Sequence, residues 1–389
     1  MSLGKEALPG DRPCVDRIAR HISDPVVRLR FLKAVAPYLG QGARRRRLYV
    51  LTVIALVAAL TLVISAALFS RLHASEPNGN ATPALRRALR PVRSKPASDV
   101  WLVDQSGESE SYSNGLRIDN HYLAATHSRS YSVFPAAGGA AVRHSDPAGI
   151  VFHTTESFQA PFLANENQAL RRFSRSVLEY VRRHRAYNFL IDRYGRVYRV
   201  VPEDQASDHS GLSAWADDTW RYVNLNESFV GVSFEAASPG AQQEAEISPA
   251  QIRSGAMLVE MLRSRYGIAA TNCVTHAQVS VNPENMRVGL HVDWASGFPF
   301  AAMGLPDNYA IALPAIWAYG FESDASFRDR AGAEMQLGIE NAQVLLARGA
   351  EATGTSLADY QRQLRRRYRG LLAQVRGARE FSESPDAGR

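Results

Sequence analysis

The sequence predicts an α/β domain with a central mixed β-sheet flanked by helices. Short apolar runs typical of buried strands occur at 149–153, 229–235 and 273–276. Around them lie longer segments whose apolar residues recur three and four positions apart, as along one face of a helix. Strands that alternate with helices are typical of a sheet covered by helices. The order of the segments leaves the parallel or antiparallel pairing of the strands open.

The first 70 residues predict a membrane anchor in front of this domain. The chain has 389 residues and a formal net charge of +7; residues 1–47 hold 11 basic and 4 acidic residues, and the remaining 34 of each sign cancel. Residues 48–69 are 22 uncharged, mostly apolar residues. As a helix they would span about 33 Å, enough to cross the hydrocarbon core. Since four arginines stand at 44–47, the positive-inside rule places residues 1–47 in the cytoplasm as a basic head.

Alternative interpretations of this region are weaker. A cleaved signal peptide is disfavoured because the apolar run starts deep in the chain and no convincing cleavage site precedes Arg71. Nucleic-acid binding is disfavoured because the positive charge lies directly before a membrane segment. We therefore expect an uncleaved anchor at 48–70 and no nucleic-acid partner. Cys14 and Cys273 would lie on opposite sides of the membrane, which excludes a disulfide between them.

Residues 71–146 are predicted to be a tether followed by a lead-in subdomain. Four prolines between 77 and 96 indicate an extended segment that lifts the domain off the bilayer. Short apolar stretches separated by Ser, Gly and Asn turns continue from there to 146.

The domain itself shows helix and hairpin signals. Residues 165–184 carry apolar side chains at the spacing of one helical face. Segments 187–191 and 196–201 flank a short turn and predict a hairpin. Ser248 is followed by Pro249 and, three residues after the serine, by a glutamine, which predicts a capped helix that ends at Gly267.

After residue 305 the pattern becomes helical. Segments 323–348 and 356–381 predict two long helices in a C-terminal extension, 306–389. The second segment carries five arginines between 362 and 369. We interpret them as a solvated basic face, and a surface for anionic wall polymers is the alternative.

Three polar residues stand where predicted strands or extended segments end. His153 follows the apolar run 150–152, His276 follows 273–275, and Asp293 lies in a short segment further on. A single histidine at a strand end is more often a satisfied core residue than a ligand. Two imidazoles and one carboxylate, however, are the ligand set of a catalytic zinc with a fourth position open for water.

In this order, His153, His276 and Asp293 resemble the zinc triad of the N-acetylmuramoyl-L-alanine amidases related to phage lysozyme-amidases and peptidoglycan recognition proteins. Segments 187–198 and 229–235 resemble inner strands of that family, the first through its Asp-Arg-x-Gly turn. The resemblance covers about 147–300 and implies a zinc amidase domain at 147–305. It also implies Zn²⁺ as cofactor and peptidoglycan or muropeptides as substrate.

The resemblance further implies roles for residues around the triad. Tyr187 occupies the position of the family's active-site tyrosine, and His291 stands where relatives carry an oxyanion donor. His209 resembles a substrate-lining histidine. Relatives often carry a glutamate general base where this chain has Ser233, and Glu235, two residues on, is the candidate replacement.

The expected function is hydrolysis of the amide between N-acetylmuramic acid and L-alanine by a zinc-activated water. Two alternatives remain open: a catalytically inactive peptidoglycan-binding module on the same fold, and a zinc hydrolase for a different amide. The gap from His276 to Asp293 is 17 residues, longer than is usual in the family, so a loop within 281–289 must bulge out. The family and the anchor together imply a bacterial inner-membrane protein with a single span, a cytoplasmic N-terminus and a periplasmic catalytic domain.

Overall fold

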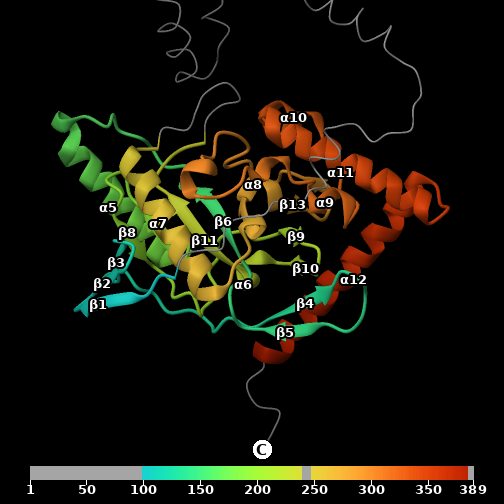
Figure 1. Ribbon diagram of the computed structural model, residues 1–389, viewed down its shortest axis with the longest axis horizontal. Helices are drawn as coiled ribbons and strands as arrows, with labels where there is room; N and C mark the ends of the chain where they lie inside the picture. The colour runs from blue at the N-terminus through green and yellow to red at the C-terminus, as the bar shows by residue number, and fades with distance from the viewer. Residues whose placement is uncertain (1–98, 239–246, 384–389) are drawn as a thin grey trace, which may run out of the picture. The chain divides into compact units, whose positions relative to one another are not determined.

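The computed structural model describes residues 99–238 and 247–383, and its core is an eight-stranded mixed sheet (Figure 1). The predicted fold class of a mixed sheet flanked by helices is confirmed. In spatial order the strands are β1 (Leu102–Ser106), β2 (Ser109–Tyr112), β3 (Arg117–Asp119), β8 (Val197–Arg199), β7 (Phe189–Ile191), β11 (Phe229–Phe234), β6 (Gly149–Thr154) and β12 (Cys273–Thr275).

The inner strands β7, β11, β6 and β12 run parallel, so their carboxyl ends meet at one edge of the sheet. Every residue of these four strands is buried. That burial explains why they read as continuous apolar runs rather than as alternating patterns. In the register of the sheet, Ser233 of β11 is the partner of both His153 of β6 and Leu190 of β7.

Two long helices cover opposite faces of this sheet. Helix α5 (Asn167–His184) packs through Leu178 and Val181 on the face that carries Leu190. Helix α7 (Pro249–Tyr266) packs on the face of Phe152 and Phe234. The N-terminus of α7 is the predicted one, because the Ser248 side chain accepts from the backbone of Gln251, whose side chain accepts from the Ser248 backbone.

A second, antiparallel sheet packs beside α5 on the same face of the main sheet. Its strands, in order, are β5 (Val142–His144), β4 (Tyr131–Pro135), β10 (Trp220–Val223) and β9 (Ala214–Ala216). Trp215 and Tyr222 of this sheet share an apolar cluster with Val151 and Val274. Within the predicted lead-in segment, β1–β3 extend the main sheet, and β4 pairs with β5 and with the later strand β10.

Of the C-terminal helices, α9 (Pro314–Trp317) and α12 (Leu357–Glu383) contact the second sheet. Helix α11 (Ala333–Ala352) packs against both of them, and α10 (Ala325–Arg330) precedes it in the chain. The hydroxyl of Tyr319 donates to the carbonyl of Trp215 at 2.7 Å, and the Tyr319 ring meets the fully buried ring of Tyr368 on α12. The prediction of one continuous helix at 323–348 is wrong. The helix is interrupted at Ala331 and Gly332, so that the segment forms two helices, α10 and α11.

The predicted anchor at 48–70 lies outside the described residues. Among residues 99–238 and 247–383, none of the helices is both long enough and apolar enough to cross a membrane.

Candidate metal centre

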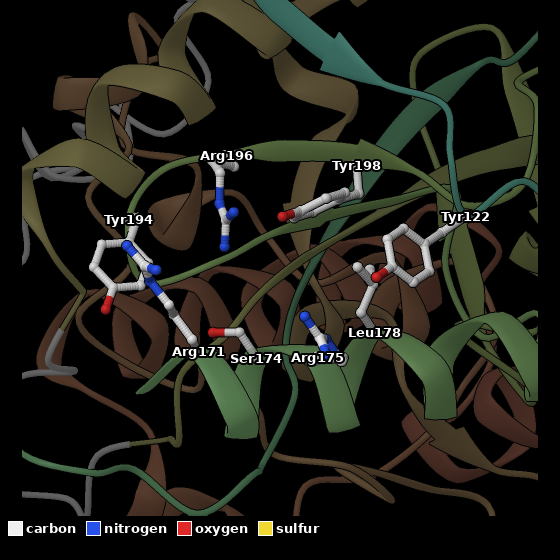
Figure 2. Close-up of a pocket in the computed structure, with 8 residues that line it drawn as sticks. All are labelled: Tyr122, Arg171, Ser174, Arg175, Leu178, Tyr194, Arg196 and Tyr198. Atoms are coloured by element: carbon white, nitrogen blue, oxygen red, sulfur yellow. The ribbon is translucent and has the colours of Figure 1, made fainter. Parts of the chain in front are cut away.

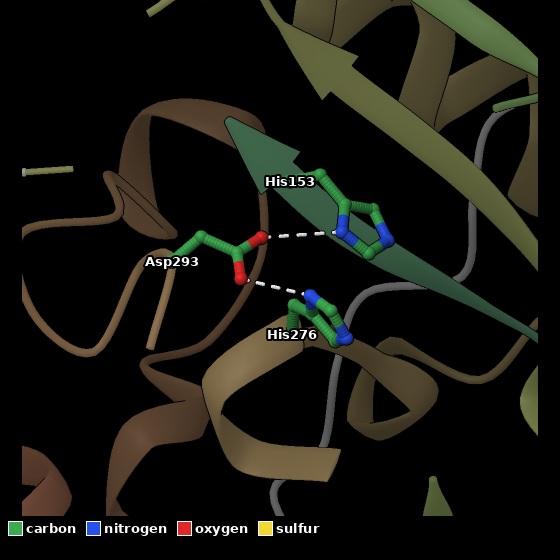
Figure 3. Close-up of side chains that lie close together, drawn as sticks. All are labelled: His153, His276 and Asp293. Carbon is green, nitrogen blue, oxygen red and sulfur yellow. Dashed lines mark hydrogen bonds and ion pairs between the residues drawn. The ribbon is translucent and has the colours of Figure 1, made fainter. Parts of the chain in front are cut away.

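Three side chains from distant parts of the chain meet at the carboxyl edge of the sheet (Figure 3). His153 is near the end of β6, His276 opens helix α8 (His276–Val279) directly after β12, and Asp293 lies in the loop after β14 (Arg287–Val288). The carboxylate of Asp293 lies between the two rings, with Oδ2 3.2 Å from His153 Nδ1 and Oδ1 2.8 Å from His276 Nδ1. The three ligand atoms lie within 4.8 Å of one another, and all three residues are buried.

A hairpin accounts for the long gap before Asp293. Strand β13 (Val281–Asn282) pairs with β14, and the hairpin is closed where the Gly289 N–H donates to the Ser280 carbonyl at 2.8 Å. The chain therefore re-enters the site close to the point at which it left. The Ala277 N–H then donates to the Asp293 carbonyl at 3.2 Å, which places this carboxylate beside His276. The expected bulge within 281–289 is this hairpin.

Burial and mutual charge decide the protonation of the cluster. Burial, with a contribution from the neighbouring His276, lowers the pKa of His153 to about 4. Burial alone would raise the pKa of Asp293, but the neighbouring His276 and His153 hold it well below the usual range of a carboxyl group. At neutral pH His153 is therefore a neutral imidazole and Asp293 an anion, the forms in which they bind a metal.

His209 orients His153 through a hydrogen bond between their rings. The Nε2–H of His209 donates to the carbonyl of Phe229 at 3.2 Å, so its Nδ1 is the acceptor for His153 Nε2–H at 3.1 Å. His153 Nδ1 then carries a lone pair and lies 3.2 Å from Asp293 Oδ2, another acceptor. Two acceptors at this distance repel each other unless a cation lies between them.

This donor set fits zinc. Two imidazole nitrogens and one carboxylate oxygen supply three protein ligands and leave a fourth position for water or substrate. The Nε2 of His276 is buried without a hydrogen-bond partner among the described residues, so its tautomer is not imposed in the way that His209 imposes that of His153.

The structure corrects the role predicted for His209. Its side chain is only 7% exposed, and both ring nitrogens are engaged by protein atoms, so it does not line a substrate surface. Gly231 on β11 makes room for it, because a Cβ there would lie 2.6 Å from His209 Cγ. The backbone N–H of His209 donates to Asn226 Oδ1 at 3.0 Å.

Two positioning residues escaped the sequence analysis. Asn226 Oδ1 accepts from the backbone N–H groups of three consecutive residues, His209, Ser210 and Gly211, and so holds the loop that carries His209. The buried guanidinium of Arg129 donates to the Phe229 carbonyl at 3.1 Å and to the Glu227 carbonyl at 2.6 Å. An isolated Asn or Arg carries no periodicity or spacing, so no sequence signal distinguishes either residue.

Replacing His209 should weaken the metal centre without removing a ligand. We expect His209→Ala to lower zinc affinity about 10–100-fold, because His153 loses the acceptor that fixes its tautomer. His209→Gln, whose amide oxygen can accept from His153, should recover part of that loss. Zinc titration of both variants against a fluorescent chelator measures the effect; unchanged affinity in His209→Ala would contradict this role.

Tyr187 borders the triad from the side of β7. Its ring centroid is 5.1 Å from that of His153, and its hydroxyl lies 3.5 Å from the Thr154 carbonyl, at the limit of a hydrogen bond. Burial and, next, the negative charge of Asp293 raise the pKa of this hydroxyl, so it remains protonated and able to donate.

His291 lies at the solvent side of the triad. Its ring stacks on that of His276 with centroids 4.8 Å apart and planes 19° apart, while its backbone N–H donates to Ser280 Oγ at 2.9 Å. Burial and the neighbouring His276 lower the pKa of His291, which favours its neutral form. The structure thus brings His291 next to the ligand residue His276.

Glu235, in contrast, is held away from the triad. Its carboxylate accepts from Ser174 Oγ on α5 at 2.6 Å and from the Arg193 backbone N–H at 3.2 Å. Burial raises its pKa although both donors oppose that shift. The side chain points to the same face as Ser233, as expected, but α5 covers that part of the face. A role as general base in place of a glutamate at Ser233 has no support in this arrangement.

Comparison with known proteins adds a family match. Residues 143–287 match the family described as N-acetylmuramoyl-L-alanine amidase. The N-acetylmuramoyl-L-alanine amidase AmiD of Escherichia coli (strain K12) is 33% identical over 89 residues, which are 22% of this chain and 31% of that protein. The resemblance read from the sequence is thereby confirmed, and it spans under a third of that relative.

Solved structures give weaker matches. A complex of E. coli AmiD with anhydro-N-acetylmuramic acid-L-Ala-D-γ-Glu-L-Lys aligns over 52% of this chain and 64% of that chain, with 19% identity and a TM-score of 0.31. Bumblebee PGRP-SA aligns over 43% of this chain and 87% of that chain, with 15% identity and a TM-score of 0.28.

Proposed function

We propose that this chain, whose residues 143–287 match the N-acetylmuramoyl-L-alanine amidase family, is a zinc-dependent peptidoglycan amidase that hydrolyses the amide between N-acetylmuramic acid and L-alanine. The observation that carries the proposal is the buried cluster of His153, His276 and Asp293, with two nitrogens and a carboxylate facing one point. A binding-only module would not need an ionised carboxylate buried between two imidazoles.

In this proposal three side chains hold the metal, and a fourth, His209, orients one of these ligands. When bound, zinc lowers the pKa of a water to about 7 and polarises the carbonyl of the amide. His153 and His276 would hold it through Nδ1 and Asp293 through a carboxylate oxygen. His209 keeps the proton of His153 on Nε2 and thereby presents the Nδ1 lone pair to the metal.

Two neutral donors flank the position where negative charge develops on the substrate. The protonated hydroxyl of Tyr187 lies on one side of His153, and the ring of His291 lies against His276. Either group can donate to the oxyanion formed when water attacks the amide carbonyl. Since Glu235 is bonded to Ser174 and Arg193, the proposal assigns no carboxylate base to this chain.

A muropeptide digest tests the proposed activity. The purified full-length chain, loaded with zinc, is expected to convert N-acetylmuramoyl-L-Ala-D-γ-Glu-L-Lys into N-acetylmuramic acid and the free tripeptide. Mass spectrometry measures the two products. Chelation should stop the reaction and added zinc should restore it. A chain that binds the muropeptide but leaves it intact at every zinc concentration would instead be the inactive binding module, an alternative favoured by Ser233 at the place of the family glutamate.

We also propose that the catalytic domain lies outside the cytoplasmic membrane of a bacterium, anchored by residues 48–70. The support is the run of 22 uncharged residues preceded by four arginines. A reporter that works only in the periplasm should be active when fused after Arg389, and a cytoplasmic reporter at the same position should be inactive. The opposite pair of results would overturn the topology.

A further inference from the structure

A cavity lies between α5 and the β7–β8 hairpin (Figure 2). Its volume is about 490 Å³, within the range of small-ligand sites. Three arginines and three tyrosines line it: Arg171, Arg175, Arg196, Tyr122, Tyr194 and Tyr198. Figure 2 shows Arg171 and Arg175 rising from α5 toward Arg196 and Tyr198 on the hairpin.

Two of the three arginines have no acidic partner among the described residues. In the part of the chain that the structure describes, Arg171 and Arg175 form no side-chain hydrogen bond or ion pair, whereas Arg196 pairs with Asp192 at 2.7 Å. Arg171 and Arg175 are both exposed and lie one helical turn apart on α5, where like charges repel. The pocket therefore carries a net positive charge that an anion would neutralise.

A tyrosine hydroxyl also lines the pocket. Tyr198 is only 6% exposed, yet its hydroxyl makes no hydrogen bond among the described side chains and opens into the pocket (Figure 2). Its ring is fixed by the edge of Tyr122 at 5.6 Å and by the Arg196 guanidinium, also 5.6 Å from the ring centroid. A hydroxyl on a fixed ring that opens into the pocket lined by Arg171 and Arg175 is available as a donor to a ligand oxygen.

The pocket lies along the same edge of the sheet as the metal centre. Asp192 and Arg196 close the hairpin at the carboxyl end of β7, and His153 is at the carboxyl end of β6. Only β11 lies between these strands. With neighbouring strands about 4.8 Å apart, the pocket begins on the order of 10–15 Å from the metal ligands.

We propose that this pocket binds a sugar that carries a carboxylate, namely the N-acetylmuramic acid of glycan strands whose peptides have already been removed. The inference rests on the proposed function and extends it to a product. Hydrolysis adds the water oxygen to the lactyl carbonyl carbon, breaks the carbon–nitrogen bond and transfers a proton of that water to the nitrogen. The stem peptide therefore leaves with a free amine on its L-alanine. Each cut thus leaves one new carboxylate on the glycan.

The chemistry of the pocket matches this ligand. Guanidinium groups bind carboxylates through paired N–H donors, and Arg171 and Arg175 both present theirs to the cavity. The tyrosine rings supply apolar faces for a sugar ring, and their hydroxyls supply donors for its oxygens. A site of this kind would retain the cut strand close to the metal centre between successive cuts.

Calorimetry with a defined glycan tests the site. The probe is a tetrasaccharide of alternating N-acetylglucosamine and N-acetylmuramic acid with free lactyl carboxylates, and the neutral N-acetylglucosamine tetramer is its control. The full-length chain should bind the first and not the second. Arg171→Gln with Arg175→Gln should weaken binding about tenfold or more, and Tyr198→Phe, which removes only a hydroxyl, should weaken it by a few-fold to tenfold.

Arg182→Gln with Arg183→Gln is the matched control, because these arginines are exposed on the same helix and outside the pocket. It should leave binding unchanged; an equal loss in both double variants would mean non-specific charge attraction and would overturn the site. Inorganic phosphate or glycerol 1-phosphate that competes at equal concentration would also overturn it, in favour of a phosphate site.

The same variants separate this inference from the proposed function. Arg171→Gln with Arg175→Gln should still cleave the one-sugar muropeptide at the wild-type rate, because neither residue contacts the metal ligands. Arginine-dependent glycan binding by a chain that cleaves no muropeptide would refute the amidase and leave the site. Cleavage by a chain whose glycan binding ignores these arginines would refute the site alone.

Discussion

Replacing either His153 or His276 with alanine is expected to abolish zinc binding and to lower amide hydrolysis by at least about a thousandfold. Each supplies one of three protein ligands, and the loss of zinc removes both the activated water and the polarisation of the carbonyl, together worth several kcal/mol. Zinc per chain, measured by mass spectrometry after dialysis, should fall from close to one to near zero. Peptide release from muropeptide should fall in parallel.

His184→Ala provides the matched control for this loss. His184 is exposed at the end of α5, and the contacts of its ring among the described residues are to Tyr180 of the same helix. Its removal should therefore leave zinc content and turnover unchanged. Circular dichroism should show both ligand variants folded, because the sheet and α7 do not depend on the metal ligands for their packing. Stoichiometric zinc in both folded ligand variants would refute the ligand assignment.

His291→Ala is expected to keep its zinc and to bind muropeptide almost normally, while turnover falls about 10²–10³-fold, or roughly 3–4 kcal/mol. A neutral imidazole that donates to the developing oxyanion acts mainly in the transition state, so kcat should fall and KM should change little. The stacking of His291 on His276 places it at the solvent side of the cluster, where an incoming carbonyl would arrive.

Two comparisons make this result specific. Glu235→Gln should retain most of the activity, because its carboxylate is engaged by Ser174 and Arg193 and lies outside the triad. Loss of zinc in step with activity in His291→Ala would make His291 a ligand and Asp293 the doubtful member. If His291→Ala instead has activity near the wild-type level, Tyr187 becomes the candidate donor to the oxyanion, and Tyr187→Phe is the next variant to measure.

Local signals predicted much of the architecture. The capping box at Ser248 and the stop at Gly267, where φ is +64°, depend on residues within a few positions of each other, so α7 could be placed to the residue. The four parallel strands are buried on both faces and were recognisable as apolar runs. The break at Ala331 and Gly332 was missed because the apolar spacing continues across it.

The sequence by itself determined the metal-ligand candidates His153, His276 and Asp293, because their residue types and order are visible without any contact. Only the tertiary structure decided how they are held. The hairpin 281–288 removes the excess length of the loop, and the Ala277 N–H fixes the Asp293 backbone beside His276. The tertiary structure also decided that His209 contacts His153 and that Glu235 accepts a hydrogen bond from Ser174 on α5. Apart from the hairpin, these assignments depend on contacts between residues 16 to 61 positions apart, and no local pattern encodes the partner of a buried polar group.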